Sequence, residues 1–285
     1  MDENLDIGSS PVSDRQQGEA AIAWQAERFP QVAVSLDPGA AGFLSVTDTW
    51  CRAGSVIDGL LDYQTRFATG MDDRTKGAHL ISFYSHHLGI AAGAVYLKTG
   101  LVADLGPGSL AMRFELCEGN DAHRSGKAPP TDARRFHVRF SRCFHSNNGA
   151  LLFHDLFVEG LTPVIETLQA RTGLSPVAQW RLAADGLAGA FLEIGMALGE
   201  EERAMATALA IVKKEGSPLL SSALRYERVD AVCKGTPVER IFRLRSGCCL
   251  YYRTEGGDFC DVCVLLDDQT QKGRLRAHIE RTGGL

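Results

Sequence analysis

The chain has 285 residues, a hydrophobic fraction of 45% and a formal net charge of -5. It therefore has enough apolar residues for a sizeable core, in one large domain or two small ones. The acidic balance argues against nucleic-acid binding, which calls for a basic surface, and no basic run would hold the chain on an anionic membrane.

Residues 1–20 are acidic and polar, and they lack the basic and apolar regions of a secretory signal. We expect them to form a disordered tail on a cytoplasmic protein. The longest apolar stretch, Leu182 to Leu198, is interrupted by Asp185 and Glu193. The sequence therefore predicts no integral membrane segment.

Residues 21–145 form a predicted N-terminal region that mixes strands with helices. Apolar and polar residues alternate in three segments, which we expect to be strands: 31–36, 109–117 and 135–143. Two helices are expected, at 48–68 and from Asp72 or Asp73 to Gly100, where a glycine can end the second helix. Residues 119–134 are polar and rich in Gly and Pro, which indicates a long loop.

Residues 146–223 form a predicted helical region. Its three helices are expected at 150–170, 176–198 and 201–214, and Ser175-Pro176 is a strong start signal for the second. Residues 224–285 are expected to hold a hairpin of strands 224–233 and 238–245, a cysteine-rich segment and one short helix. Helices combined with a few antiparallel strand pairs indicate the α+β class, with a small C-terminal subdomain.

Four of the eight cysteines lie within 16 residues, in the pattern C-C-x10-C-x2-C. These four are Cys248, Cys249, Cys260 and Cys263. A C-x2-C pair can grip one metal ion, whereas neighbouring residues in an extended segment point to opposite sides. The pattern therefore favours a two-iron cluster over one zinc ion, although the spacing alone leaves zinc open. A disulfide is disfavoured in a reducing compartment.

The remaining cysteines, Cys51, Cys117, Cys143 and Cys233, lie in apolar patterns and are expected to be small buried residues. Of the pair His86-His87 on the long helix, we expect one to face the core and one the solvent. Gly256-Gly257 reads as a turn inside the cysteine segment. No phosphate-binding glycine motif is present, so electrons would come from a separate protein such as a ferredoxin or a flavin reductase.

The cysteine pattern and its surroundings resemble the C-terminal signature of the FhuF-type siderophore-iron reductases. Arg243 and Arg245 precede the cysteine pair, Leu250-Tyr251-Tyr252-Arg253 follows it, and Trp180 lies where the family carries a tryptophan. The sequence departs from the family at Asp261-Val262 and Val264, where Gly-Asp and then Pro are usual.

The resemblance implies a cytoplasmic reductase of ferric siderophores, in which the four cysteines hold a [2Fe-2S] cluster. We expect the siderophore to be a hydroxamate, with catecholates and mixed carboxylates left open by the sequence. No catalytic residue beyond the cluster is expected. Residues that could lie near the cluster or the substrate are Arg243, Arg245, Arg253, Tyr251, Tyr252 and Trp180. Equally, the arginines could pair with Glu239, Glu255 and Asp258, and the aromatic residues could simply pack.

Two other functions share the same cysteines. One is a non-enzymatic iron–sulfur carrier or redox sensor, and the other is a binding protein with a structural zinc ion. For a reductase, we expect the siderophore to dock in a cleft between the cysteine segment and the N-terminal half, with residues 119–134 as a lid.

Overall fold

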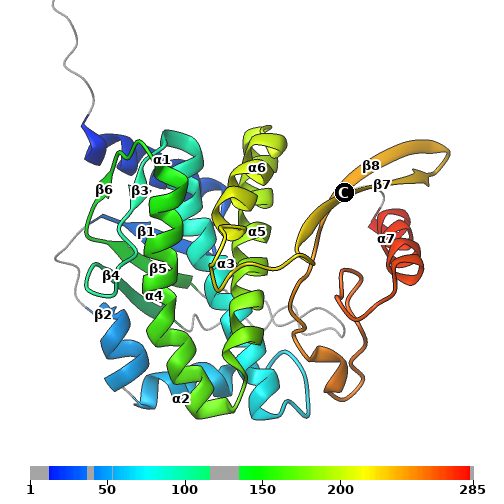
Figure 1. Cartoon of the computed structure of the whole chain (residues 1–285), viewed down its shortest axis with the longest axis horizontal. Coiled ribbons are helices and arrows are strands. Elements are labelled where there is room, and N and C mark those ends of the chain that lie inside the picture. Colours follow the sequence, from blue (N-terminus) through cyan, green and yellow to red (C-terminus); the bar gives the residue numbers. More distant parts are fainter. Residues whose placement is uncertain (1–12, 37–41, 53, 116–134, 283–285) are drawn as a thin grey trace, which may run out of the picture.

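The computed structural model describes residues 13–36, 42–52, 54–115 and 135–282. A bundle of helices packs against a small sheet, and a hairpin with the last helix stands to one side of the bundle (Figure 1). The arrangement confirms the predicted α+β class. No described helix is both long and apolar enough to cross a membrane.

The first helix, α1 (Asp14–Arg28), begins inside the segment that was expected to be a disordered tail. Ser13 and Gln16 form a capping box, in which each side chain satisfies a backbone N–H of the first turn. Gln25 is fully buried and donates to the carbonyl oxygens of Phe29 and Val32 at 3.1 and 2.8 Å. The tail prediction is therefore wrong for residues 14–20, and residues 1–12 lie outside the described part.

A four-stranded sheet has the order β1-β5-β4-β2, in which β1 runs parallel to β5 and the other pairs are antiparallel. Its strands are β1 (Val32–Ser35), β2 (Leu44–Ser45), β4 (Leu110–Glu115) and β5 (Arg135–Phe140). The three predicted strands are confirmed. The two-residue strands β2, β3 (Val102–Ala103) and β6 (Cys143–Phe144) were not predicted, because they are too short to show an alternating pattern.

Six further helical segments build the bundle: η1 (Asp48–Arg52), α2 (Gly54–Gln64), α3 (Asp73–Thr99), α4 (Gly149–Thr172), α5 (Pro176–Leu198) and α6 (Glu201–Val212). The helix expected at 48–68 is thus a π-helical turn followed by α2. The two long central helices, α3 and α5, approach closely at glycines: a Cβ atom at Gly89 would lie 2.8 Å from the Cβ of Ala190. This packing brings the N-terminal half of the chain against the helix that supports the cysteine segment.

The C-terminal hairpin pairs β7 (Arg225–Cys233) with β8 (Thr236–Leu244). Its turn is only Lys234-Gly235, both with positive φ, so the predicted four-residue turn is too long. The chain then forms the short helix η3 (Tyr251–Arg253) and ends in α7 (Asp268–Thr282). The hairpin and α7 share a separate small core, made of Val229, Phe242, Leu244, Leu275 and Ile279.

Candidate metal centre

The four clustered cysteines lie in the loop between β8 and α7. Cys263 is buried at 3% exposure, and the other three are half-buried. Leu250 takes the left-handed conformation, with φ of 60°, and its N–H points to the Cys248 sulfur at 3.4 Å. Gly257 is necessary where the loop doubles back, because a Cβ atom there would overlap the carbonyl oxygen of Tyr251. The predicted glycine turn is therefore confirmed.

The thiols fall into two neighbouring pairs. Cys249 lies beside Cys260, and Cys248 lies beside Cys263, so each pair joins one residue of the Cys248-Cys249 dipeptide to one cysteine of the C-x2-C turn. Among the described residues, no three His, Cys, Asp or Glu side chains are arranged to hold a single metal ion. Two separate thiol pairs suit two iron ions better than one tetrahedral zinc ion.

Two arginines, Arg243 in β8 and Arg245 one residue beyond the end of β8, extend toward these thiols. Nη1 of Arg245 lies 3.9 Å from the Cys260 sulfur, and its Nε lies 3.8 Å from Oδ2 of Asp185 on α5. Arg243 donates from Nη1 to the Asp185 carbonyl oxygen at 2.8 Å. The hydrogen bond with Cys260 and the nearby Arg245 charge lower the pKa of Cys249, against the effect of burial. The thiolate form that binds metal is thereby favoured.

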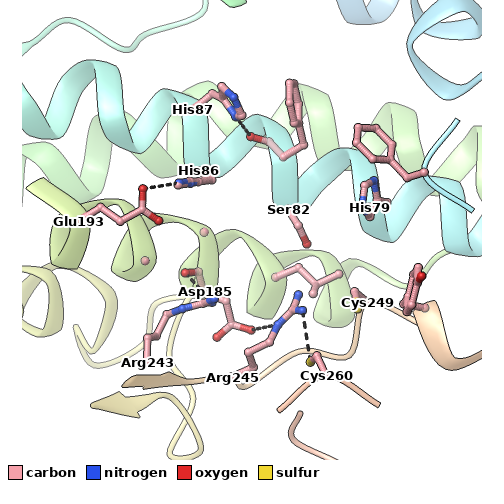
Figure 2. A pocket seen from close by; sticks show the side chains of 16 residues that line it. His79, Ser82, His86, His87, Asp185, Glu193, Arg243, Arg245, Cys249 and Cys260 are labelled. Carbon is pink, nitrogen blue, oxygen red and sulfur yellow. Dashed lines mark hydrogen bonds and ion pairs between the residues drawn. The ribbon is translucent and has the colours of Figure 1, made fainter. Parts of the chain in front are cut away.

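A cavity of about 510 Å³ opens beside this segment (Figure 2). One wall is a single face of α3 and the opposite wall is α5, with Arg243 of β8 and the adjacent Arg245 below them. Cys249, Cys260 and Tyr251 complete its lining. The cavity thus joins the N-terminal half of the chain to two of the four cysteines.

The α3 wall carries three imidazoles, from His79, His86 and His87. Nδ1 of His87 lies 2.8 Å from the Phe83 carbonyl oxygen, and Nδ1 of His79 lies 2.7 Å from Oε1 of Gln64. Both Nδ1 atoms face acceptors, so each must carry the proton and leave Nε2 as an acceptor. We expected one of His86 and His87 to face the core and the other to face the solvent. This expectation is wrong, because both side chains line the cavity.

These imidazoles are held in the neutral form. Burial lowers the pKa of His87 to about 4, against a hydrogen bond to Phe83 that acts in the opposite direction. Burial, with the neighbouring His87 and Arg243, lowers the pKa of His86 to about 3. Nε2 of His86 lies 3.3 Å from Oε2 of Glu193, whose own pKa is raised by burial. The α3 wall therefore carries no imidazolium charge near neutral pH.

The remaining predicted site residues lie in different surroundings. Tyr251 lines the cavity, whereas Tyr252 packs on Phe259 with ring centroids 4.8 Å apart. Arg253 forms an exposed ion pair with Asp72 at 2.9 Å, and Trp180 packs half-buried against the main core. Arg253, Tyr252 and Trp180 are therefore not part of the cavity lining.

The carboxylates that were considered as partners of the arginines lie elsewhere. Glu239 pairs with Arg228 at 2.6 Å, and Asp258 pairs with Arg274 at 3.1 Å. The buried Asp185 is instead the acidic group beside Arg243 and Arg245.

Sequence reasoning missed the α3 residues of the cavity and Asp185. A signal for Asp185 was available, since a carboxylate inside an apolar helix is buried only where it is paired. No comparable signal marked His79 or Ser82, because their place at the site depends on how α3 packs across α5.

Two of the isolated cysteines, Cys143 and Cys233, were expected to be buried. Cys143 is buried at 9% exposure, as predicted, whereas Cys233 is half-buried and its thiol donates to the Ile279 carbonyl oxygen. The side chains of Cys51 and Cys117 lie outside the described part.

Asp261, where the sequence departs from the family, pairs with His278 at 3.1 Å and Arg281 at 3.2 Å, so it fastens the C-x2-C turn to α7.

No curated protein matches the chain. Residues 245–265 match the family model described as the FhuF 2Fe-2S C-terminal domain, a segment that contains all four clustered cysteines. The predicted resemblance and the predicted [2Fe-2S] cofactor are thereby confirmed, because this C-terminal segment is similar to the FhuF 2Fe-2S domain.

Proposed function

We propose that the protein is a ferric-siderophore reductase, in which Cys248, Cys249, Cys260 and Cys263 would hold the [2Fe-2S] cluster. The observation that carries the proposal is the cavity of about 510 Å³, because Cys249 and Cys260 are part of its lining. A substrate in this cavity would lie next to the redox centre. When bound, a [2Fe-2S] cluster supplies one electron at a time.

One electron is enough to release iron from a siderophore. Fe³⁺ is bound tightly by hard, anionic oxygen donors, whereas those donors hold the less charged Fe²⁺ far less tightly. The protein's own residues therefore need only bind and orient the complex and exclude water around it. The aromatic rings of Phe67, Phe83 and Tyr251 on the cavity wall suit this purpose.

The charges around the cavity favour a ferric hydroxamate as the substrate. Arg243 and Arg245 face the acidic groups of Asp185 and Glu193, and the histidines are neutral. Two positive and two negative groups largely cancel, and cysteine thiolates add negative charge. Three hydroxamates neutralise Fe³⁺, whereas three catecholates leave an anionic complex that this cavity would repel.

The electron donor would be a separate protein, such as a ferredoxin or a flavin reductase, because the sequence contains no glycine motif for a nicotinamide or flavin nucleotide. We place the reaction in the cytoplasm, where reducing conditions keep cysteines available as metal ligands.

The decisive test uses the intact holoprotein under anaerobic conditions. The cluster is reduced chemically, a ferric hydroxamate is added, and both cluster reoxidation and Fe²⁺ capture by a chelator are followed. We expect both signals to appear together. If neither appears, the protein is not a reductase of this substrate, and a non-enzymatic iron–sulfur carrier or redox sensor becomes the better function.

Two variants test the role of the cluster ligands and the role of the cavity independently. Cys260→Ser should lose the cluster, and full cluster retention would refute the ligand assignment. Ser82→Phe should fill the cavity, keep the visible spectrum of the cluster and lower the rate of siderophore reduction at least tenfold. Ser222→Phe, at an exposed position outside the cavity, is the matched control and should react at the normal rate.

A further inference from the structure

A single buried carboxylate holds the chain that leads into the cysteine pair. Asp185 is 1% exposed, and its Oδ1 accepts from the backbone N–H and the hydroxyl of Ser246 at 2.8 and 2.9 Å. Its Oδ2 accepts from the Gly247 N–H at 2.9 Å. These bonds join α5 to the two residues immediately before Cys248.

The contact between this segment and α5 has little freedom to shift. A Cβ atom at Gly247 would lie 2.9 Å from Cγ of Leu182 and 3.0 Å from its backbone nitrogen, so the loop lies directly on the helix. Ser246 is itself only 2% exposed, and its hydroxyl also lies 3.3 Å from the Arg181 carbonyl oxygen. The position of the cysteine pair therefore depends on where Asp185 holds these two residues.

The Asp185 carboxylate also lies near the guanidinium of Arg245, which extends to the sulfur of Cys260. Arg245 lies between Asp185 and Cys260, with its Nε 3.8 Å from Oδ2 and its Nη1 3.9 Å from the sulfur. The Arg245 side chain is 13% exposed, so water screens these charges weakly. The Asp185 carboxylate, the Arg245 guanidinium and the Cys260 sulfur thus lie in a row beside the cavity (Figure 2).

We propose that Asp185 is a positioning residue for the iron–sulfur centre, with two separable effects. Its hydrogen bonds to Ser246 and Gly247 fix the cysteine pair, and its charge partly offsets that of Arg245 and so lowers the redox potential. The proposal rests on the cluster being held by the four cysteines, and it deepens the proposed function without using the siderophore.

The electrostatic effect predicts shifts of opposite sign. In Asp185→Asn the Arg245 charge is unopposed, which favours an added electron nearby, so the midpoint potential should rise. In Arg245→Gln the positive charge next to Cys260 is lost and Asp185 keeps only Arg243 as its positive neighbour, so the potential should fall. A residue that serves only to stabilise the fold would not produce this pair of shifts.

The test is a redox titration of the purified holoprotein, followed by visible absorption, with Asp230→Asn as the control. Asp230 is exposed on β7, and its variant should keep the normal potential. Shifts of the same sign in Asp185→Asn and Arg245→Gln, or no shift in either, would overturn the electrostatic claim.

Ser246→Ala tests the positioning effect. It can still refute this part of the proposal if Asp185→Asn does not retain a cluster. This variant removes one hydrogen bond but leaves the carboxylate and Arg245 in place. We expect its cluster to be lost to an iron chelator at least threefold faster, with the potential unchanged. A normal rate of cluster loss would overturn the positioning claim. Neither readout needs the siderophore, so a failure of the reductase function would leave both results intact.

Discussion

Acid should destabilise the fold through the buried imidazole of His87. Its pKa is about 4 in the folded chain, against an ordinary value of 6.5. The unfolded chain therefore binds a proton below pH 6.5, whereas the folded chain does not until pH approaches 4. Between pH 8 and pH 5 this difference lowers the free energy of unfolding by up to about 2 kcal/mol. Because the His87 side chain is partly exposed, solvent screening reduces this effect, and we expect the free energy of unfolding to fall by about 1–2 kcal/mol.

The measurement is urea unfolding followed by circular dichroism at several pH values from 8 to 5. His87→Asn can still donate to the Phe83 carbonyl oxygen but does not titrate in this range, so its stability should vary less with pH by about 1–2 kcal/mol. Cluster loss in acid affects both proteins and cancels in the comparison. His145→Asn, at a 58% exposed side chain, is the control. If His87→Asn keeps the wild-type pH dependence, the imidazole is not held neutral by burial.

Four further predictions concern stability. Gly160→Ala would place a methyl group against a backbone carbonyl oxygen, so thermal or urea unfolding should show a loss of about 1–3 kcal/mol. Gly273→Ala on α7 meets nothing and should instead gain roughly 0.5–1 kcal/mol, and a loss there would contradict the argument. Arg253→Gln breaks only an exposed ion pair, so stability should change by less than about 1 kcal/mol and the cluster potential should not move. Tyr226→Phe removes a 2.7 Å hydrogen bond from β7 to α5 and should cost about 1 kcal/mol in urea unfolding.

Local patterns in the sequence were enough to predict the long elements. α3 begins at the Asp72 cap and ends at Gly100, and α5 begins at Ser175-Pro176, because capping bonds and left-handed glycines are determined by neighbouring residues. The two-residue strands and α1 were missed. The short strands are stabilised by partners elsewhere in the chain, which local patterns do not record, whereas α1 carried a local signal in its Ser13–Gln16 capping box that was overlooked.

The cysteine cluster could also be found from a local pattern, since all four cysteines lie in one short segment. The cavity could not be predicted in this way, because it is assembled by packing between distant parts of the chain. Arg253 and Tyr252 lie close to the cysteine pair in sequence but do not line the cavity, whereas His86 is more than 150 residues away and lines it. Proximity in sequence was therefore a poor guide to which side chains surround the centre.

The small core of the hairpin and α7 has a consequence for how the chain matures. Five buried apolar residues are too few to hold such a unit firmly by themselves, and small units of this kind depend on metals or crosslinks. α7 is fastened to the cysteine loop through Gln271, which donates to the Cys263 carbonyl oxygen at 3.0 Å, and through the Asp261 ion pairs. Without the metal, this C-terminal unit should therefore open more readily than the helical bundle and be the part of the chain most exposed to proteases.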